Sequence, residues 1–357
     1  MFKRGLIITL IVGVLVAIAI SAPKILLFLA GKKQTINSTE KSIIIREQFT
    51  ANQLAKFLIE KEIIDSEKSF LTIAKEVGLD NQTLALGKYV ILSGTNYLDL
   101  CEGFTIQENG QGKAEAKVNV VFNATRDLRT MAKEVEKCIM VDSASLVTYL
   151  EDEATLSKYG FSSAQFPAMF FPGKYEMYFD TNVEAFTDSM AQEFKRFWTI
   201  ERKNQLINIG LSSPSQVSTL ASIVYSEQSR HADEWPTIAA LYLNRLKKGM
   251  KLQSDPTFKF CWGEALKGVQ RLTAEHRNQD CSYNTYIYNG LPPGPISLTS
   301  KQVLEAVLYP SAVDYLFMCA KPDYSYRHNF ETSDVAHVRN AANYQRWLAN
   351  ELKKKKK

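Results

Sequence analysis

One carboxylate, Glu227, falls on the apolar side of a predicted helix. Ser213 can cap that helix, Pro214 suits its first position, and Gln216 stands where a capping box takes an amide or a carboxylate. The apolar stripe is formed by Val217, Leu220, Ala221 and Val224. Glu227 follows Val224 by three residues and Leu220 by seven, so it shares the stripe.

An acid in that position can act as a proton donor. Leaving water for an apolar wall disfavours the charged form and raises the pKa of a carboxyl group, and the negative end of the helix acts in the same direction. The group can then stay protonated near neutral pH and serve as a general acid. The alternative is a side chain that reaches solvent at the helix end or pairs with Arg230 or Arg245.

The segments after this helix are rich in polar and aromatic side chains. A second helix, "DEWPTIAALYLNRLKKGM", opens near Pro236 and closes at Gly249, and the loops "KLQSDPTFKF", "SYNTYIYNGLPPGPI" and "YRHNF" follow. Hydrogen-bonding groups and flat rings suited to a sugar-binding cleft are supplied by Gln253, Asp255, Tyr283, Asn284, Thr285 and Tyr286. Asn284 and Thr285 are alternatively simple turn residues.

Five motifs together resemble a known family. "LASIVYSEQ", "LYLNRL", "MKLQSDPT", "YNTYIYNGLPPGPI" and "HNF" followed by "DVAH" are similar, in order and spacing, to the YceG-like family of endolytic murein transglycosylases, over residues 220–337. The resemblance identifies Glu227 with the family's catalytic glutamate. The family pattern is like I-V-E-K-E, with two acids, whereas this chain has Tyr225 and Ser226 in place of the earlier pair.

The resemblance also implies roles for other residues. Those expected to bind substrate are Gln253, Ser254, Asp255, Asn284, Thr285, Tyr286 and His328, and those expected to shape the site are Asn244 and Arg245. His337 is expected either to make a packing contact or to touch substrate. No metal or cofactor is expected, because neither the Cys nor the His spacing is typical of a metal site.

The reaction that the resemblance implies cleaves the MurNAc-GlcNAc bond of nascent peptidoglycan without water. Glu227 protonates the glycosidic oxygen and later accepts the proton of the muramyl C6 hydroxyl, which leaves 1,6-anhydroMurNAc ends and limits strand length. Two alternatives are a noncatalytic scaffold that binds peptidoglycan, and a hydrolytic muramidase in which Asp255 is a second carboxylate. A peptidase is disfavoured because no nucleophile motif and no HExxH is present.

The N-terminal sequence predicts a membrane anchor. Residues 5–30 contain an uncharged run long enough to cross a bilayer, and Lys3 and Arg4 before it favour a cytoplasmic N-terminus at residues 1–4. A cleaved signal peptide is the alternative, disfavoured by Pro23 at the start of the mature chain. We expect a single pass through the inner (cytoplasmic) membrane, with the catalytic domain on the periplasmic or extracytoplasmic side. The resemblance implies peptidoglycan synthases as partners.

The rest of the chain is predicted to be α+β. After a linker at 31–42, residues 43–100 follow a strand-helix-helix-strand order whose size resembles the glycan-binding module LysM, and residues 101–181 suggest a second copy; a structural spacer is the alternative. A connecting helix is predicted at 182–210, a catalytic domain with mixed helices and strands at 211–349, and a basic tail at 350–357.

Charge and cysteine content limit the other possibilities. The net charge of +5 equals the five lysines of residues 353–357, so the remaining chain is near neutral and lacks the basic surface of a nucleic-acid-binding protein. Among five cysteines, Cys261 and Cys281 could close a loop in an exported chain, and free, partly buried thiols are the alternative.

Overall fold

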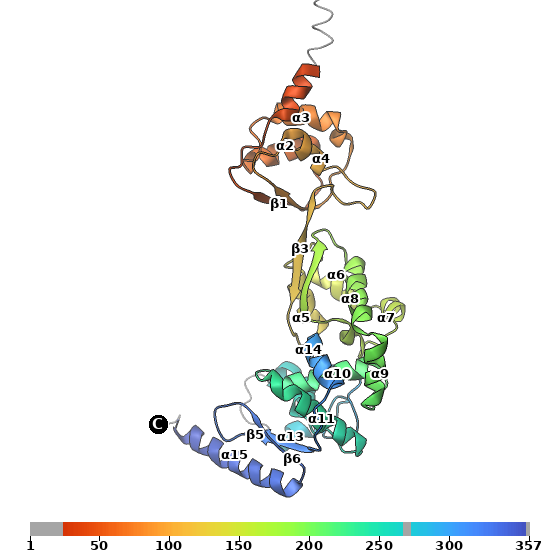
Figure 1. Cartoon of the computed structure of the whole chain (residues 1–357), viewed down its shortest axis with the longest axis vertical. Coiled ribbons are helices and arrows are strands. Elements are labelled where there is room, and N and C mark those ends of the chain that lie inside the picture. The colour runs from red at the N-terminus through yellow and green to blue at the C-terminus, as the bar shows by residue number, and fades with distance from the viewer. Residues whose placement is uncertain (1–23, 267–272, 355–357) are drawn as a thin grey trace, which may run out of the picture. The chain divides into compact units, whose positions relative to one another are not determined.

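The structure is a computed structural model that describes residues 24–266 and 273–354 (Figure 1). It has the mixed α+β fold that the sequence predicts. Most of the predicted anchor, residues 5–23, lies outside the described ranges, as do residues 1–4. Within those ranges, no helix combines the length and the apolar character that crossing a bilayer requires.

The described chain forms two compact units. The first contains the residues up to 120 with 138–140 and 175–181, and the second contains 121–137, 141–174 and the residues from 182 onward. The first unit begins with β1 (Lys41–Ile45), α2 (Ala51–Glu60), α3 (Glu67–Glu76), β2 (Gly87–Ile91) and α4 (Tyr97–Gly103). The strand-helix-helix-strand order predicted for residues 43–100 is therefore confirmed.

Side chains alternate between buried and exposed along the strands of the first unit, and the buried ones form part of its core. Strands β1 and β2 pair antiparallel, with Ile43 opposite Tyr89, and Ile43, Ile45 and Tyr89 are buried while Ile44 is exposed. Leu54 of α2 and Phe70 of α3 pack on this buried face. The four strands of the sheet follow the order β1-β2-β3-β4, in which β3 is Glu115–Phe122 and β4 is Gly173–Tyr178.

Between β3 and residue 210 the chain forms more and shorter helices than the sequence predicts. They are α5 (Leu128–Val135), α6 (Ser143–Glu151), α7 (Glu153–Tyr159), α8 (Val183–Phe197) and α9 (Ile200–Asn208). The predicted connecting helix at 182–210 is thus two helices, α8 and α9, and a break also separates α6 from α7. In each case a side chain caps the new start: Thr199 accepts a hydrogen bond from the Arg202 amide and Asp152 from the Thr155 amide.

The remaining elements of the second unit follow one buried helix, α10 (Pro214–Glu227). They are α11 (Trp235–Lys247), α12 (Asp255–Trp262), α13 (Ala274–Arg277), α14 (Lys301–Leu308), β5 (Phe317–Ala320), β6 (His328–Glu331) and α15 (Asp334–Lys354). Strands β5 and β6 form an antiparallel hairpin, and α15 runs along it (Figure 1). These two strands, together with the helices, confirm the mixture predicted for residues 211–349.

Helix α10 starts and packs as its sequence predicts. Ser213 accepts a hydrogen bond from the Gln216 amide and Pro214 occupies the first turn, although the Gln216 side chain reaches Ser212 rather than the cap residue. The predicted stripe is completely buried, and Ser222 on another side of the helix is buried too, accepting a hydrogen bond from the Ile296 amide. A helix buried on several sides holds the residue at its C-terminal end, Glu227, in a fixed place.

We expect Leu220→Ala to lower the free energy of unfolding by about 2 to 5 kcal/mol, because Leu220 is fully buried and its loss leaves a cavity. The matched control is Ile207→Ala on α9, where the side chain is 66% exposed and the change should stay within about 0.5 kcal/mol. Urea unfolding of both variants measures the difference. Equal effects at the two positions would contradict the conclusion that α10 is a buried helix of the core.

Candidate functional site

The carboxyl group of Glu227 is held by two hydroxyl groups. Tyr242 of α11 donates a hydrogen bond to its Oε1 at 2.7 Å, and the Ser254 hydroxyl donates to the same Oε1 at 2.6 Å. Neither Arg230 nor Arg245, the two arginines considered from the sequence, forms an ion pair with Glu227. Among the described residues, no side chain or backbone amide donates a hydrogen bond to its second oxygen, Oε2. Two donors on one oxygen fix the carboxyl plane and leave the second oxygen available.

Burial raises the pKa of Glu227 above its ordinary value of 4.5. The hydrogen bonds from Ser254 and Tyr242 oppose this effect, and the negative charge of Asp255 adds to it. Burial also raises the pKa of Tyr242, so its phenol remains a donor. The sequence-based expectation of an acid that retains its proton agrees with the direction of this shift.

Glu227 lies in the wall of a cavity of about 400 Å³. The predicted site residues that line it with Glu227 are Arg245, Gln253, Asp255, Tyr286 and His328. His337, Ala341, Tyr344 and Gln345 of α15 complete one side. Helices α10 and α11, the segment before α12, the β5-β6 hairpin and α15 therefore meet around one space.

Asp255 is a second carboxylate in the same cavity, in different surroundings. The Tyr286 phenol donates to its Oδ1 at 2.6 Å, and the Arg277 Nε lies 3.6 Å from that oxygen. Burial and the bond to Asp255 raise the pKa of Tyr286, which keeps its proton. The cavity thus contains an acid whose protonated form is favoured and a carboxylate with a hydroxyl donor and a cation beside it.

Arg245 shapes the cavity wall. Its Nε donates to the Leu316 carbonyl at 2.6 Å, and its Nη1 donates to the Leu252 carbonyl at 3.0 Å and to the Gln253 Oε1 at 3.2 Å. Gln253 has a left-handed backbone with φ of 53°, which is strained for a residue other than glycine. Arg245 therefore helps to hold a strained residue at the cavity.

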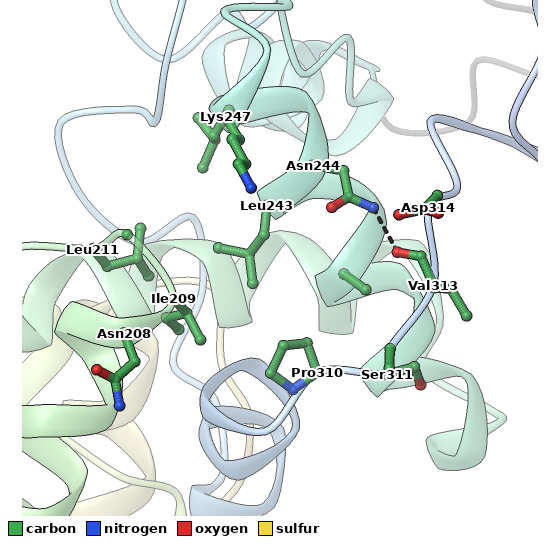
Figure 2. A pocket seen from close by; sticks show the side chains of 14 residues that line it. Asn208, Ile209, Leu211, Leu243, Asn244, Lys247, Pro310, Ser311, Val313 and Asp314 are labelled. Atoms are coloured by element: carbon green, nitrogen blue, oxygen red, sulfur yellow. Dashed lines mark hydrogen bonds between the residues drawn. The ribbon is translucent and has the colours of Figure 1, made fainter.

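Asn244 lies outside this cavity, in the wall of a separate one of about 730 Å³ (Figure 2). Its amide donates to the Val313 carbonyl at 2.8 Å and to the Tyr315 carbonyl at 3.2 Å. These bonds tie α11 to the segment that leads into β5. Asn244 can thus position the site without touching a ligand in the cavity of Glu227.

Asn284 and Thr285 lie behind the cavity wall. Their exposed fractions are 0% and 2%, and neither is among the residues that line the cavity. Thr285 accepts a hydrogen bond from the Ser254 amide through its hydroxyl, and Asn284 donates to the carbonyls of Arg277 and Gln279. Their observed contacts join neighbouring loops, and a role in substrate binding stays a prediction.

His328 joins the β5-β6 hairpin to the segment after α10. Its Nδ1 lies 2.9 Å from Glu234 Oε2, and Gln228 donates to the same carboxylate oxygen at 2.8 Å. Burial would raise the pKa of Glu234, but the bonds from Gln228 and His328 hold it below the ordinary value. The His337 ring stacks on Phe317, which is the packing role considered for it, and it also lines the cavity, so a contact with substrate stays a prediction.

The sequence reasoning missed Tyr242, Arg277 and the side chains of α15 other than His337. Tyr242 had a signal: it lies three residues before Arg245 in an apolar helix, and a buried phenol needs a hydrogen-bond partner. No sequence signal indicated Arg277 or the other side chains of α15, because only tertiary packing brings them to the cavity. The sequence left open whether Cys261 and Cys281 form a disulfide or remain free thiols. A disulfide joins Cys261 of α12 to Cys281.

Comparison with known proteins gives consistent relatives. The model of the YceG-like family matches residues 43–343. The chain is 26% identical over 317 residues to the endolytic murein transglycosylase of Bacillus subtilis strain 168, covering 82% of this chain and 84% of that protein. It is 24% identical over 303 residues to that of Streptococcus pneumoniae strain D39, covering 80% of this chain and 52%, or about half, of the relative. A crystal structure of a YceG-like protein from Listeria monocytogenes shares the fold, with a TM-score of 0.52 and 22% identity, over 85% of this chain and 99% of that one.

We expect Glu227→Gln to stabilise the protein increasingly as the pH rises. Because the pKa of this carboxyl is higher in the folded state than its ordinary value of 4.5, the unfolded wild-type chain loses the proton first. Wild-type stability therefore falls from that value up to the folded pKa, whereas the amide does not titrate. Urea unfolding of both proteins from about pH 4 to about pH 8 should show the smallest difference at the acid end. A difference independent of pH would contradict the raised pKa.

Proposed function

The chain belongs to the YceG-like family, and on that premise we propose that it is a peptidoglycan lytic transglycosylase. In this proposal the enzyme cleaves strands internally at the MurNAc-GlcNAc bond and leaves 1,6-anhydroMurNAc ends. The observation that carries the proposal is the carboxyl of Glu227, in a cavity wall, with both hydroxyl donors on one oxygen. The two relatives named endolytic murein transglycosylase support the same activity.

Glu227 serves as acid and then as base in this mechanism. Since Tyr242 and Ser254 both donate to Oε1, the proton is on Oε2, from which it passes to the glycosidic oxygen as the bond to C1 breaks. The muramyl C6 hydroxyl then attacks C1 of the oxocarbenium-like sugar, and its proton returns to the Glu227 carboxylate. The two hydroxyl donors stabilise that carboxylate between the steps, because hydrogen bonds to a charged acceptor are the stronger kind.

Asp255 provides negative charge where the sugar becomes positive. It lines the same cavity, and its orientation is fixed by Tyr286. The same observation supports a second candidate, a hydrolytic muramidase, in which Asp255 activates a water molecule or bonds to the sugar. The two reactions give different ends, so the products distinguish them.

We propose further that the enzyme acts on nascent strands beside the membrane and so limits their length. The uncharged run in residues 5–30 supports a single-pass anchor in the cytoplasmic membrane, with residues 1–4 inside and the catalytic region outside. The strand-helix-helix-strand order of β1, α2, α3 and β2 supports a LysM-like glycan-binding role for residues 43–100. Peptidoglycan synthases are the partners that such a location implies.

We expect Glu227→Gln to lower the rate of strand cleavage by about 10²- to 10⁴-fold, the usual loss when a general acid is removed. Mass spectrometry of products from purified peptidoglycan should show 1,6-anhydroMurNAc ends with the wild type. Glu201→Gln, an exposed change on α9, is the matched control. Reducing ends would favour the muramidase, and binding without cleavage by the wild type would favour a scaffold.

The anchor is tested by comparing the full chain with one that begins at Ser42. We expect the full chain to stay with the membrane fraction after a high-salt wash, which removes proteins bound by charge alone, and the shorter chain to be released. Intact mass of the full-length product distinguishes a retained anchor from a cleaved signal peptide. Loss of the N-terminal residues would contradict the anchor.

A further inference from the structure

Three aromatic side chains contact one another beside the cavity of Glu227. The Tyr344 and Trp347 rings of α15 have centroids 5.8 Å apart, and the Trp347 ring lies edge-on to Tyr324 of the β5-β6 turn at 5.3 Å. Tyr344 lines the cavity, whereas Tyr324 is 65% exposed. These three residues, here called the aromatic strip, run from the cavity wall to the outer surface.

Helix α15 supports the aromatic strip without being buried. His337, Ala341 and Tyr344 are spaced so that one helix face lines the cavity, and Trp347 follows Tyr344 on that face by three residues. The helix runs along the β5-β6 hairpin (Figure 1), yet none of its residues is fully buried. The wall that it provides is therefore partly open to solvent.

We propose that the aromatic strip is a carbohydrate subsite that binds the part of the glycan strand lying outside the cavity. The inference rests on the proposed function and names additional substrate contacts for it. The face of an aromatic ring is electron-rich and packs against the C-H groups on the face of a pyranose ring. Gln345, which is exposed and lines the cavity, supplies an amide for sugar hydroxyl groups at the inner end of the strip.

The contacts of Tyr324 favour a fixed platform. Its hydroxyl donates to the Glu351 carboxylate, and Lys354 pairs with Glu351 at 2.7 Å. The hydroxyl is thereby held at the rim while the ring remains exposed. Tyr324 thus has a defined orientation before a strand arrives, which reduces the entropy that binding would otherwise cost.

The alternative is that the same rings only hold α15 against the hairpin, a structural role here called a clamp. The two roles predict different effects on the binding of short and long substrates. A clamp supports the cavity wall, so its loss lowers the affinity for short and long substrates together. A subsite outside the cavity is reached only by long strands. Its loss therefore weakens the binding of long strands and leaves that of a short fragment unchanged.

The test uses the full chain carrying Glu227→Gln, so that ligands bind without being cleaved. Trp347→Ala and Tyr324→Ala are added separately, and calorimetry measures binding of long glycan strands stripped of stem peptides and of the disaccharide GlcNAc-MurNAc. We expect each change to weaken long-strand binding by roughly 2- to 10-fold without changing disaccharide binding. Trp347→Phe should restore most of the affinity, and Tyr309→Ala, an exposed tyrosine elsewhere (47%), should have no effect.

Three results would overturn the subsite. An equal loss of affinity for both ligands, with a lower unfolding temperature, would identify a clamp. Unchanged affinity for both ligands, or no binding of long strands before the strip is altered, would also contradict it. Failure of the proposed activity gives a different result. In that case the wild type cleaves nothing while the dependence on strand length persists in the binding measurements.

Discussion

The two hydrogen bonds to Glu227 Oε1 require three parts of the chain to meet. Helix α10 supplies the carboxyl at its last residue, α11 supplies Tyr242, and the segment before α12 supplies Ser254. Each part is fixed independently, since α10 is buried on several sides and the Ser254 amide is bonded to Thr285. Much of the second unit can be understood as the framework that brings these groups within hydrogen-bonding distance.

Two carboxylates of one cavity have different chemistry because their surroundings differ. Glu227, the last residue of α10, is half-buried beside Tyr242 of α11, and desolvation favours its protonated form. Asp255 has a phenol donor in Tyr286 and a guanidinium in Arg277, which suit a charged group. Opposite environments for neighbouring acids are a general way to separate a proton donor from an electrostatic stabiliser.

Local patterns predicted the helix of Glu227 but not the partners of its carboxyl. Ser213, Pro214 and the apolar stripe are signals within one helix, so its start and buried face could be predicted. Tyr242 and Ser254 are 15 and 27 residues away and meet Glu227 only in the tertiary structure. A polar loop residue such as Thr285 looks the same in sequence whether it contacts a ligand or holds a neighbouring loop, and the resemblance to a family did not resolve that difference.

The bond between Cys261 and Cys281 makes the cavity sensitive to redox conditions. It joins α12, which begins with Asp255, to the loop that follows Arg277, so it restrains both partners of one ion pair. A disulfide persists only where the surroundings are oxidising. A thiol reductant in a purification buffer would therefore loosen the contact between Asp255 and Arg277 in the cavity wall without reacting with Glu227.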